Sequence, residues 1–222
     1  MDLAERLHAA LARIARAAER SRRAPSDVTL VAVTKTVAPA DIEQAFRLGV
    51  THFGENRVQD AEQKLPSLAH LRPQSTWHMV GHLQTNKVRK ALAIFDVVQS
   101  VDSLHLAQEL SRRATRPVPV LLEVNVAGEA AKFGFRPEEL PQAAQAIARL
   151  PSLDLRGLMT VAPLVADAGD VRPVFQKLRE LRDALGLKEL SMGMTDDFEV
   201  AVEEGATLVR IGRAIFGERP PA

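Results

Sequence analysis

The sequence of 222 residues contains no cysteine and no tyrosine, and its aromatic residues are few. Without cysteine the chain forms no disulfide and offers no thiolate nucleophile, cysteine-ligated zinc or iron–sulfur centre. Without tyrosine it has no phenolic acid or base. The sequence also has no large excess of one charge, because it contains 29 basic and 28 acidic side chains. This balance argues against a dedicated binder of the nucleic-acid phosphate backbone.

Long hydrophobic runs are absent as well. No apolar run approaches the roughly 20 residues that span a bilayer, and Asp2 and Glu5 stand where a signal peptide would carry basic residues. We therefore expect a cytoplasmic protein. The remaining composition, 46% hydrophobic and 26% charged, is typical of a folded globular chain. The length suits one α/β barrel.

Short runs rich in Val, Ile and Leu alternate with longer runs at helical period, which predicts repeated strand–helix units. The expected strands are 28–34, 51–54, 76–81, 97–101, 118–125, 154–160, 189–192 and 207–212. The helices between them are expected to begin near residues 39, 58, 86, 103, 137, 171 and 196. Eight short apolar strands at this spacing favour a single (β/α)8 barrel of the TIM type, with an open doubly wound sheet as the alternative.

An N-terminal amphipathic helix is expected over residues 1–22, packed on the barrel wall, because apolar residues recur there at helical spacing. These residues are Leu3, Leu7, Leu11 and Ile14. Only a short segment follows the eighth strand, so this helix would cover the wall beside it. We expect residues 1–222 to form one domain.

Lys35 closes the apolar run 30–34. Period-two alternation puts it on the same face as Val31 and Val33. A lysine cation in such surroundings is costly to desolvate, so its amine is expected to lose a proton readily and to suit Schiff-base formation with an aldehyde. The alternative is a lysine whose stem lies along the barrel and whose ammonium reaches solvent.

A strand end, a glycine turn and a helix start follow one another over residues 191–197. In one interpretation this is a well-capped loop, with Thr195 as the cap of a helix that begins with two aspartates. In the other, the hydroxyls of Ser191 and Thr195 and the backbone N–H groups near Gly193 form a phosphate site. The two carboxylates would repel a dianion, so a nearby cation is needed.

That cation is expected from the last strand. Alternation puts Arg210 and Gly212 on one face, and phosphate sites in such barrels are frequently formed by the loops after strands seven and eight. Gly212 allows a ligand to approach the backbone, while Arg210 or Arg213 supplies positive charge. A salt bridge is the alternative role for either arginine.

Polar residues also follow the second, third and fifth strands. Asn56, His78 and His82 are candidates for lining a ligand pocket at the same rim, although two histidines without a third ligand predict no metal site. Helix capping is the alternative role for His82. Lys132 is a second lysine at this rim and is expected to be solvated.

Five segments occur in a recognisable order between about residues 28 and 217. They are VAVTK at 31–35, FGEN at 53–56, WHMVGHLQTNK at 77–87, SMGMTDD at 191–197 and VRIG at 209–212. Together they closely resemble the pyridoxal-phosphate homeostasis protein family, whose fold is similar to the N-terminal barrel of bacterial alanine racemase.

The resemblance implies a complete cofactor site. Lys35 would hold pyridoxal 5′-phosphate as a Schiff base, and Arg210 would face the pyridine nitrogen. Ser191, Thr195, Gly212 and neighbouring amides would take the phosphate. Lys132 matches a lysine noted in the family as an alternative cofactor contact.

Asn56, His82 and Gly193 complete the expected cofactor-binding set. The sequence departs from the family pattern at two positions. Thr34 stands where serine is frequent, which is a mild change. Arg213 stands where a small hydroxyl residue is common, so its guanidinium would replace the hydroxyl as the phosphate contact.

An arginine at the pyridine nitrogen discourages protonation there, whereas many enzymes place a carboxylate at that nitrogen to strengthen the electron sink. We therefore expect a carrier that binds the cofactor, limits the free aldehyde and delivers it to apo-enzymes, with no catalytic residue. The rival function is an amino-acid racemase. A two-base racemase of the related barrel type needs a tyrosine, which this sequence lacks, while a one-base or histidine-assisted racemase stays open.

A third function class is nucleic-acid binding through the arginines of the N-terminal segment. They are Arg6, Arg13, Arg16, Arg20, Arg22 and Arg23. No aromatic stacking surface accompanies them, so a solvated helix face is the preferred interpretation. We expect neither nucleic-acid nor membrane partners, and a monomer.

Overall fold

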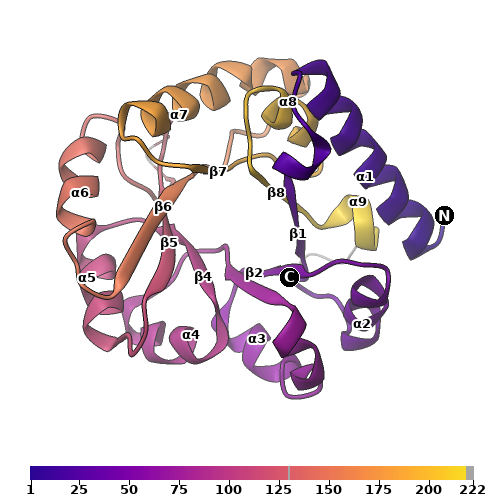
Figure 1. The fold of residues 1–222 in the computed structure, drawn as a ribbon, viewed down its shortest axis with the longest axis horizontal. Helices are drawn as coiled ribbons and strands as arrows, with labels where there is room; N and C mark the ends of the chain where they lie inside the picture. The colour runs from indigo at the N-terminus through magenta and orange to yellow at the C-terminus, as the bar shows by residue number, and fades with distance from the viewer. Residues whose placement is uncertain (130, 219–222) are drawn as a thin grey trace.

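The computed structural model describes residues 1–129 and 131–218, over which eight parallel strands close into a barrel (Figure 1). Each strand pairs with the next in the sequence, and the last pairs with the first. The strands are β1 (Thr29–Val33), β2 (His52–Glu55), β3 (Thr76–Met79), β4 (Val97–Val101), β5 (Val118–Glu123), β6 (Leu153–Met159), β7 (Glu189–Ser191) and β8 (Leu208–Ile211). The barrel prediction is confirmed, with every strand end within two residues of its expected position.

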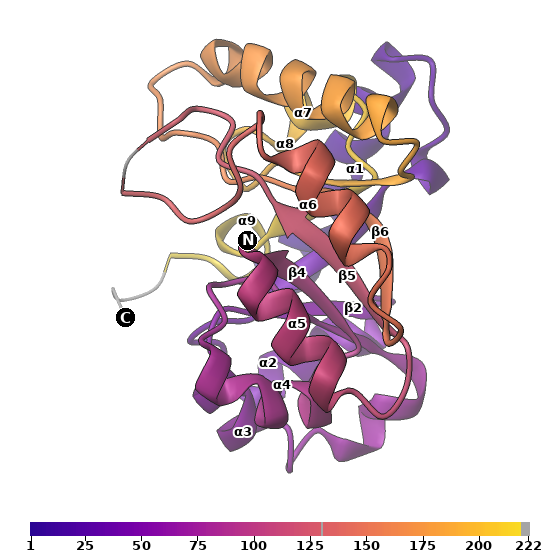
Figure 2. The same cartoon turned by 90° about the vertical axis from the view of Figure 1, so that its left-hand side faces the viewer.

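Helices stand outside the strands, as the side view shows for α5 and α6 in front of β5 and β6 (Figure 2). They are α1 (Leu3–Arg20), α2 (Pro39–Arg47), α3 (Val58–Lys64), α4 (Val88–Ile94), α5 (Leu104–Arg113), α6 (Leu140–Ile147), α7 (Arg172–Ala184), α8 (Phe198–Glu203) and α9 (Arg213–Phe216). Three predicted starts are early by two or three residues. α4 begins at Val88, because residues 85–87 form a separate tighter turn. α6 begins at Leu140, with a proline in its first turn where no amide donor is needed, and α8 begins at Phe198 because residues 195–197 form a turn.

The main hydrophobic core fills the shell between strands and helices. Strand residues that point outward, such as Phe53 and Trp77, are fully buried there. Their rings stack with centroids 5.1 Å apart. Burying this apolar surface on every side supplies most of the drive to fold.

A smaller apolar cluster lies apart from this shell. Its members are Val31, Val97, Leu121, Met159 and Leu208. Side chains alternate across a strand, so neighbours of the outward-pointing residues face the barrel interior. The interior is therefore packed, and the carboxyl ends of the strands form the rim on which a site can be placed.

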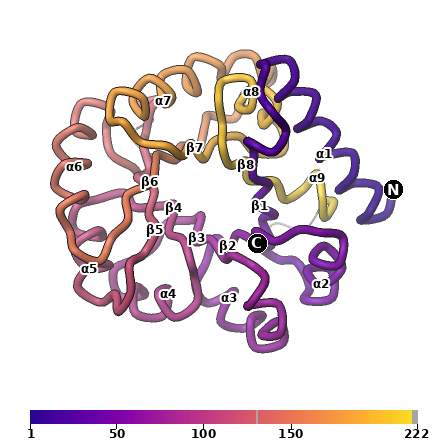
Figure 3. Tube along the Cα trace, in the orientation of Figure 1, coloured from indigo at the N-terminus to yellow at the C-terminus, as the bar shows by residue number. Residues whose placement is uncertain are grey.

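Helix α1 packs against α8 and α9, so the first helix lies beside the last two helices of the described residues (Figure 3). Ala10 is buried in this contact, whereas Leu11 is 41% exposed, which corrects its predicted place on the apolar face. The arginine face is solvated only in part: Arg16, Arg20 and Arg22 are exposed, whereas other arginines contact the barrel. Arg13 pairs with Glu199 at 2.7 Å, and Arg23 donates to the carbonyl of Val202.

These basic side chains hold α1 on the barrel, which leaves fewer of them to meet a nucleic acid. Among the described residues, none of the helices has the length and apolar character required to cross a membrane.

Candidate functional site

A cavity of about 580 Å³ opens at the carboxyl ends of the strands. It is large enough for a small cofactor. Most of the predicted cofactor-binding residues line it, drawn from the ends of β1, β2, β3, β7 and β8. These are Lys35, Asn56, His82, Thr195, Arg210, Gly212 and Arg213.

Lys35 lies two residues beyond β1, in a turn at the cavity edge. The desolvated setting that we expected is not found, because the side chain is exposed. The next residue, Thr36, has a φ of 59°, a left-handed conformation that a β-branched residue rarely adopts. Strain of this kind persists only where surrounding contacts enforce it, and it is common at functional sites.

A buried ion pair enforces this turn from the outer side of the barrel. Lys64, the last residue of α3, donates to the carbonyl oxygen of Thr34 at 2.7 Å and to Glu55 Oε1 at 2.7 Å. The Thr34 hydroxyl donates to the same carboxylate oxygen. Glu55 is fully buried. The network therefore fixes the backbone immediately before Lys35, and sequence reasoning missed it because its members are far apart in the chain.

Arg210 forms part of the cavity floor and is 4% exposed. Its Nη1 donates to Ser191 Oγ at 2.6 Å and its Nη2 to the Thr160 carbonyl oxygen at 2.8 Å. Burial lowers the pKa of Arg210 to about 10, against the opposing charges of Glu123 and Asp197. The guanidinium is thus cationic at neutral pH and held in one orientation.

Ser191 and Gly193 belong to the predicted set but are not among the described residues that line the cavity. The Ser191 hydroxyl lies below the cavity, where it accepts from Arg210 and donates to Gln99 Oε1 at 2.6 Å. Gly193 has a φ of 91°, and a Cβ there would lie 2.5 Å from the Cβ of Ala201. Both residues shape the site from beneath, and their predicted contact with a phosphate stays a prediction.

Thr195 lines the cavity but does not cap α8. Its Oγ1 accepts a long hydrogen bond from the Ala214 amide at 3.4 Å. The turn is instead closed by Asp197, whose carboxylate accepts from the Met194 amide at 2.6 Å. Arg213 is hydrogen-bonded to Asp196, so its positive charge at the rim is paired.

His82 forms one wall of the cavity together with a residue that the sequence analysis did not single out. Its ring stacks on Phe133 with centroids 3.8 Å apart and an interplanar angle of 11°. His82 Nδ1 lies 2.8 Å from Asp102 Oδ2. An aromatic wall with a carboxylate behind it suits a flat ligand that has a π face.

Glu123 also lines the cavity and was missed. Burial, reinforced by the charge of Asp102, raises its pKa to about 7, while Arg210 and His82 oppose the rise. Its sequence signal was present, because Glu123 closes an apolar strand in the way Lys35 does. A carboxyl group that titrates near neutrality in a cavity can accept or donate a proton.

Asn56 approaches the third strand closely. A Cβ on Gly81 would lie 2.4 Å from the Asn56 carbonyl oxygen, so only glycine fits beside it. Both residues line the cavity. This contact brings the ends of β2 and β3 together at the rim.

Two other candidates lie outside the cavity. His78 is 2% exposed inside the barrel. Lys132 pairs with Glu129 at 2.6 Å and lies within 3.4 Å of the Val161 carbonyl oxygen. Over the described residues, no three His, Cys, Asp or Glu side chains are placed to hold a metal ion.

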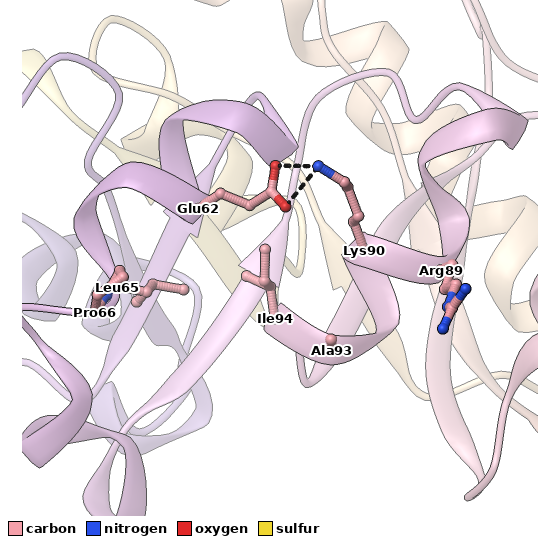
Figure 4. A pocket seen from close by; sticks show the side chains of 7 residues that line it. All are labelled: Glu62, Leu65, Pro66, Arg89, Lys90, Ala93 and Ile94. Carbon is pink, nitrogen blue, oxygen red and sulfur yellow. Dashed lines mark hydrogen bonds and ion pairs between the residues drawn. The ribbon is translucent and has the colours of Figure 1, made fainter.

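A second hollow of about 500 Å³ lies on the barrel flank between α3 and α4 (Figure 4). Its side chains come from these two helices and the segment after α3, and Lys90 bridges both carboxylate oxygens of Glu62 there. None of its described lining residues lies at a strand end. In such barrels the ligand site is at the strand ends, so the first cavity is the candidate site.

Comparison with known proteins agrees with this geometry. Residues 7–220 match the family model described as alanine racemase, N-terminal domain. The pyridoxal phosphate homeostasis protein of Aquifex aeolicus (strain VF5) is 44% identical, with 99% of each chain covered. The protein of the same name from Pseudomonas aeruginosa is 45% identical, with 98% of this chain and 96% of the relative covered.

A solved structure gives the same result in three dimensions. PipY of Synechococcus elongatus PCC7942, determined with PLP bound, has a TM-score of 0.84 and 38% identity to this chain. The match covers 97% of this chain and all of PipY, 100%. The chain therefore belongs to the family of pyridoxal phosphate homeostasis proteins, built on the alanine racemase N-terminal fold.

Proposed function

We propose that this chain binds pyridoxal 5′-phosphate in the cavity at the strand ends and serves in homeostasis of that cofactor. One observation carries the proposal: a single cavity brings together an amine, a buried cation and the segments after β7 and β8. PipY, whose structure contains PLP, supports the choice of ligand.

The chemistry of the lining fits the three reactive parts of the cofactor. The Lys35 amine suits the aldehyde, and Arg210, which only donates hydrogen bonds, suits an unprotonated ring nitrogen. Thr195, Gly212 and Arg213 would hold the phosphate, with Arg213 released in part from Asp196. When bound, the cofactor supplies a reactive aldehyde.

The residues of this chain restrain that reactivity. Arg210 is fixed by two hydrogen bonds and stays charged, so it keeps protons away from the ring nitrogen. Asn56 and the ring of His82, backed by Phe133, would close the cavity around the ligand. We propose that the chain is a carrier that limits free aldehyde and delivers the cofactor to apo-enzymes, and that it acts in the cytoplasm as a monomer.

Borohydride trapping tests the proposal. The protein is incubated with pyridoxal 5′-phosphate, reduced, digested and mapped by mass spectrometry. We expect the reduced adduct on Lys35 and its loss in Lys35→Ala. Lys132→Ala is the matched control, because Lys132 pairs with Glu129 outside the cavity lining and its variant should retain the adduct. An adduct absent from the unmutated protein, or mapped elsewhere, contradicts the proposal.

Amino-acid racemisation is the second candidate function. It is favoured by Glu123, whose pKa of about 7 provides a proton-transfer group in the same cavity. A chiral assay of alanine and other amino acids tests it, with Glu123→Gln as the informative variant. Turnover that disappears in both Lys35→Ala and Glu123→Gln would make catalysis the main function.

A further inference from the structure

A chain of polar side chains crosses the barrel interior, where apolar side chains usually dominate. It runs from β2 through β3, β4 and β7 to β8. Its members are His52, His78, Gln99, Ser191 and Arg210. The last four are at most 4% exposed, and only His52 is partly exposed. Buried polar groups in such numbers are costly unless all of them are paired.

The hydrogen bonds of this chain run in one direction. Arg210 can only donate, so Ser191 Oγ accepts from it at 2.6 Å. The Ser191 hydroxyl then donates to Gln99 Oε1 at 2.6 Å, which leaves the Gln99 amide nitrogen facing His78 Nδ1 at 2.9 Å. An amide nitrogen is a donor, so His78 Nδ1 must accept.

The direction continues to the end of the chain. With Nδ1 accepting, the neutral His78 ring carries its proton on Nε2 and donates to His52 Nδ1, 3.0 Å away. Burial, and then the neighbouring His52, lowers the pKa of His78 to about 3, so the ring stays neutral. A protonated His78 would present a second donor to the Gln99 amide and break the chain.

The chain acts on the site through its last bond. Arg210 is anchored at Nη1 by Ser191 and at Nη2 by the Thr160 carbonyl oxygen. Those two anchors set the plane of the guanidinium at the cavity floor. Ser191 is itself held by Gln99, and Gln99 is held by His78. The orientation of Arg210 therefore depends on residues that do not line the cavity.

We propose that Ser191, Gln99 and His78 are positioning residues that orient the Arg210 guanidinium toward an acceptor on the ligand, through a one-directional hydrogen-bond chain that ends at His52. This inference deepens the proposed function and rests on it, since the acceptor would be the ring nitrogen of pyridoxal 5′-phosphate. It assigns Ser191 a role different from direct phosphate binding.

The first test needs no ligand. In protein labelled with 15N-histidine, long-range 1H–15N correlation spectra report which ring nitrogen carries the proton. We expect His78 as the neutral Nε2–H form, with its signals shifted in Ser191→Ala. Ser111→Ala is the matched control, because Ser111 is a buried serine on α5 outside the chain. An Nδ1–H form of His78, or spectra unchanged in Ser191→Ala, would overturn the inference.

The second test uses pyridoxal 5′-phosphate as the probe. We expect Ser191→Ala and Gln99→Met to weaken binding about ten-fold, the change for losing one hydrogen bond to a charged group, and to shift the pH midpoint of the bound chromophore. Ser191→Thr keeps the hydroxyl and should restore both values, while Ser111→Ala should change neither. Equal affinities and midpoints in all variants would contradict the inference.

The two tests separate the proposals. If the unmutated protein forms no borohydride adduct, the proposed function fails, and the His78 tautomer alone decides whether the chain exists. If the adduct forms on Lys35 and the Ser191→Ala spectrum matches the unmutated one, the function stands and the positioning role fails.

Discussion

The shell between strands and helices and the interior of the barrel are built from different chemistry. The shell is almost continuously apolar and surrounds the strands on every side. The interior combines a small apolar cluster with a chain of polar groups that ends at Arg210. The difference teaches that stability and site geometry depend on separate layers. Burial of apolar area in the shell stabilises the fold, and directed hydrogen bonds inside the barrel set the geometry of the site.

Truncating the shell should have the largest effect on stability. Phe175 on α7 is fully buried in the shell, and Phe175→Ala should lower the free energy of unfolding by about 3–5 kcal/mol. Chemical denaturation measures this loss. Cofactor affinity of the remaining folded protein should be unchanged, because the residue does not line the cavity. A large loss of cofactor affinity at unchanged stability would show that the shell also sets the geometry of the site.

The Glu55–Lys64 pair is a charged exception within the shell. Lys64→Met leaves a fully buried carboxylate without its cation and should cost about 3 kcal/mol of unfolding free energy. It should also loosen the turn that carries Lys35, which slows adduct formation. The double variant Lys64→Met with Glu55→Gln removes the unpaired charge and should recover part of the stability but not the adduct rate. Recovery of both would assign the pair a purely structural role.

The polar groups of the barrel interior should make the stability of the protein depend on pH. The pKa of His78 is about 3 in the folded chain against 6.5 for an unperturbed histidine, so below pH 6.5 the unfolded chain binds a proton that the folded chain does not. This contribution to stability is complete above pH 6.5 and is lost as the pH falls toward 3. At two pH units below the histidine value, the stability lost amounts to about 3 kcal/mol.

Comparison of variants isolates this effect. His78→Asn should flatten the fall in stability between pH 6.5 and 4.5 measured by denaturation. Glu123 acts in the opposite sense, because burial raises its pKa to about 7 and favours the folded state at low pH. Identical pH profiles for the His78→Asn and unmutated proteins would show that this histidine is not held neutral.

Removing a partly exposed ion pair on the outside of α1 should have the smallest effect on stability. Arg13 on α1 pairs with Glu199 and lies 4.4 Å from the centre of the Phe198 ring. Both side chains of the pair are about a third exposed, so Arg13→Ala should lower unfolding free energy by only about 1 kcal/mol. High salt should reduce the difference between the two proteins. A loss as large as that of Phe175→Ala would mean that this partly exposed pair stabilises the fold as strongly as a fully buried side chain of the shell.

The strands were predictable because both of their faces are buried, which leaves uninterrupted apolar runs in the sequence. The same alternation placed Lys35 and Arg210 at strand ends, and the cavity contains both. Helix starts were less predictable, since Thr195 and Asp197 compete to close the same turn and only the packed backbone decides between them.

The groups that act at a distance could not be predicted. Ser191 was expected at the phosphate because its motif is short and local, whereas its partners Gln99 and Arg210 come from other strands. Asp102 and Phe133 are unremarkable in sequence and acquire a role only when His82 lies between them. Alternation along one strand gives the direction of a side chain but not the neighbour it meets.

The stacked pair of Trp77 and Phe53 has an optical consequence. Trp77 is the single tryptophan of a chain without tyrosine, so essentially all intrinsic ultraviolet emission arises from one indole. That indole is fully buried, donates to Ser75 Oγ and precedes His78 on β3. A chromophoric ligand at the strand ends would accept its excitation energy. Trp77 is thus an intrinsic fluorescent probe. Its emission can report both ligand binding and the integrity of the shell.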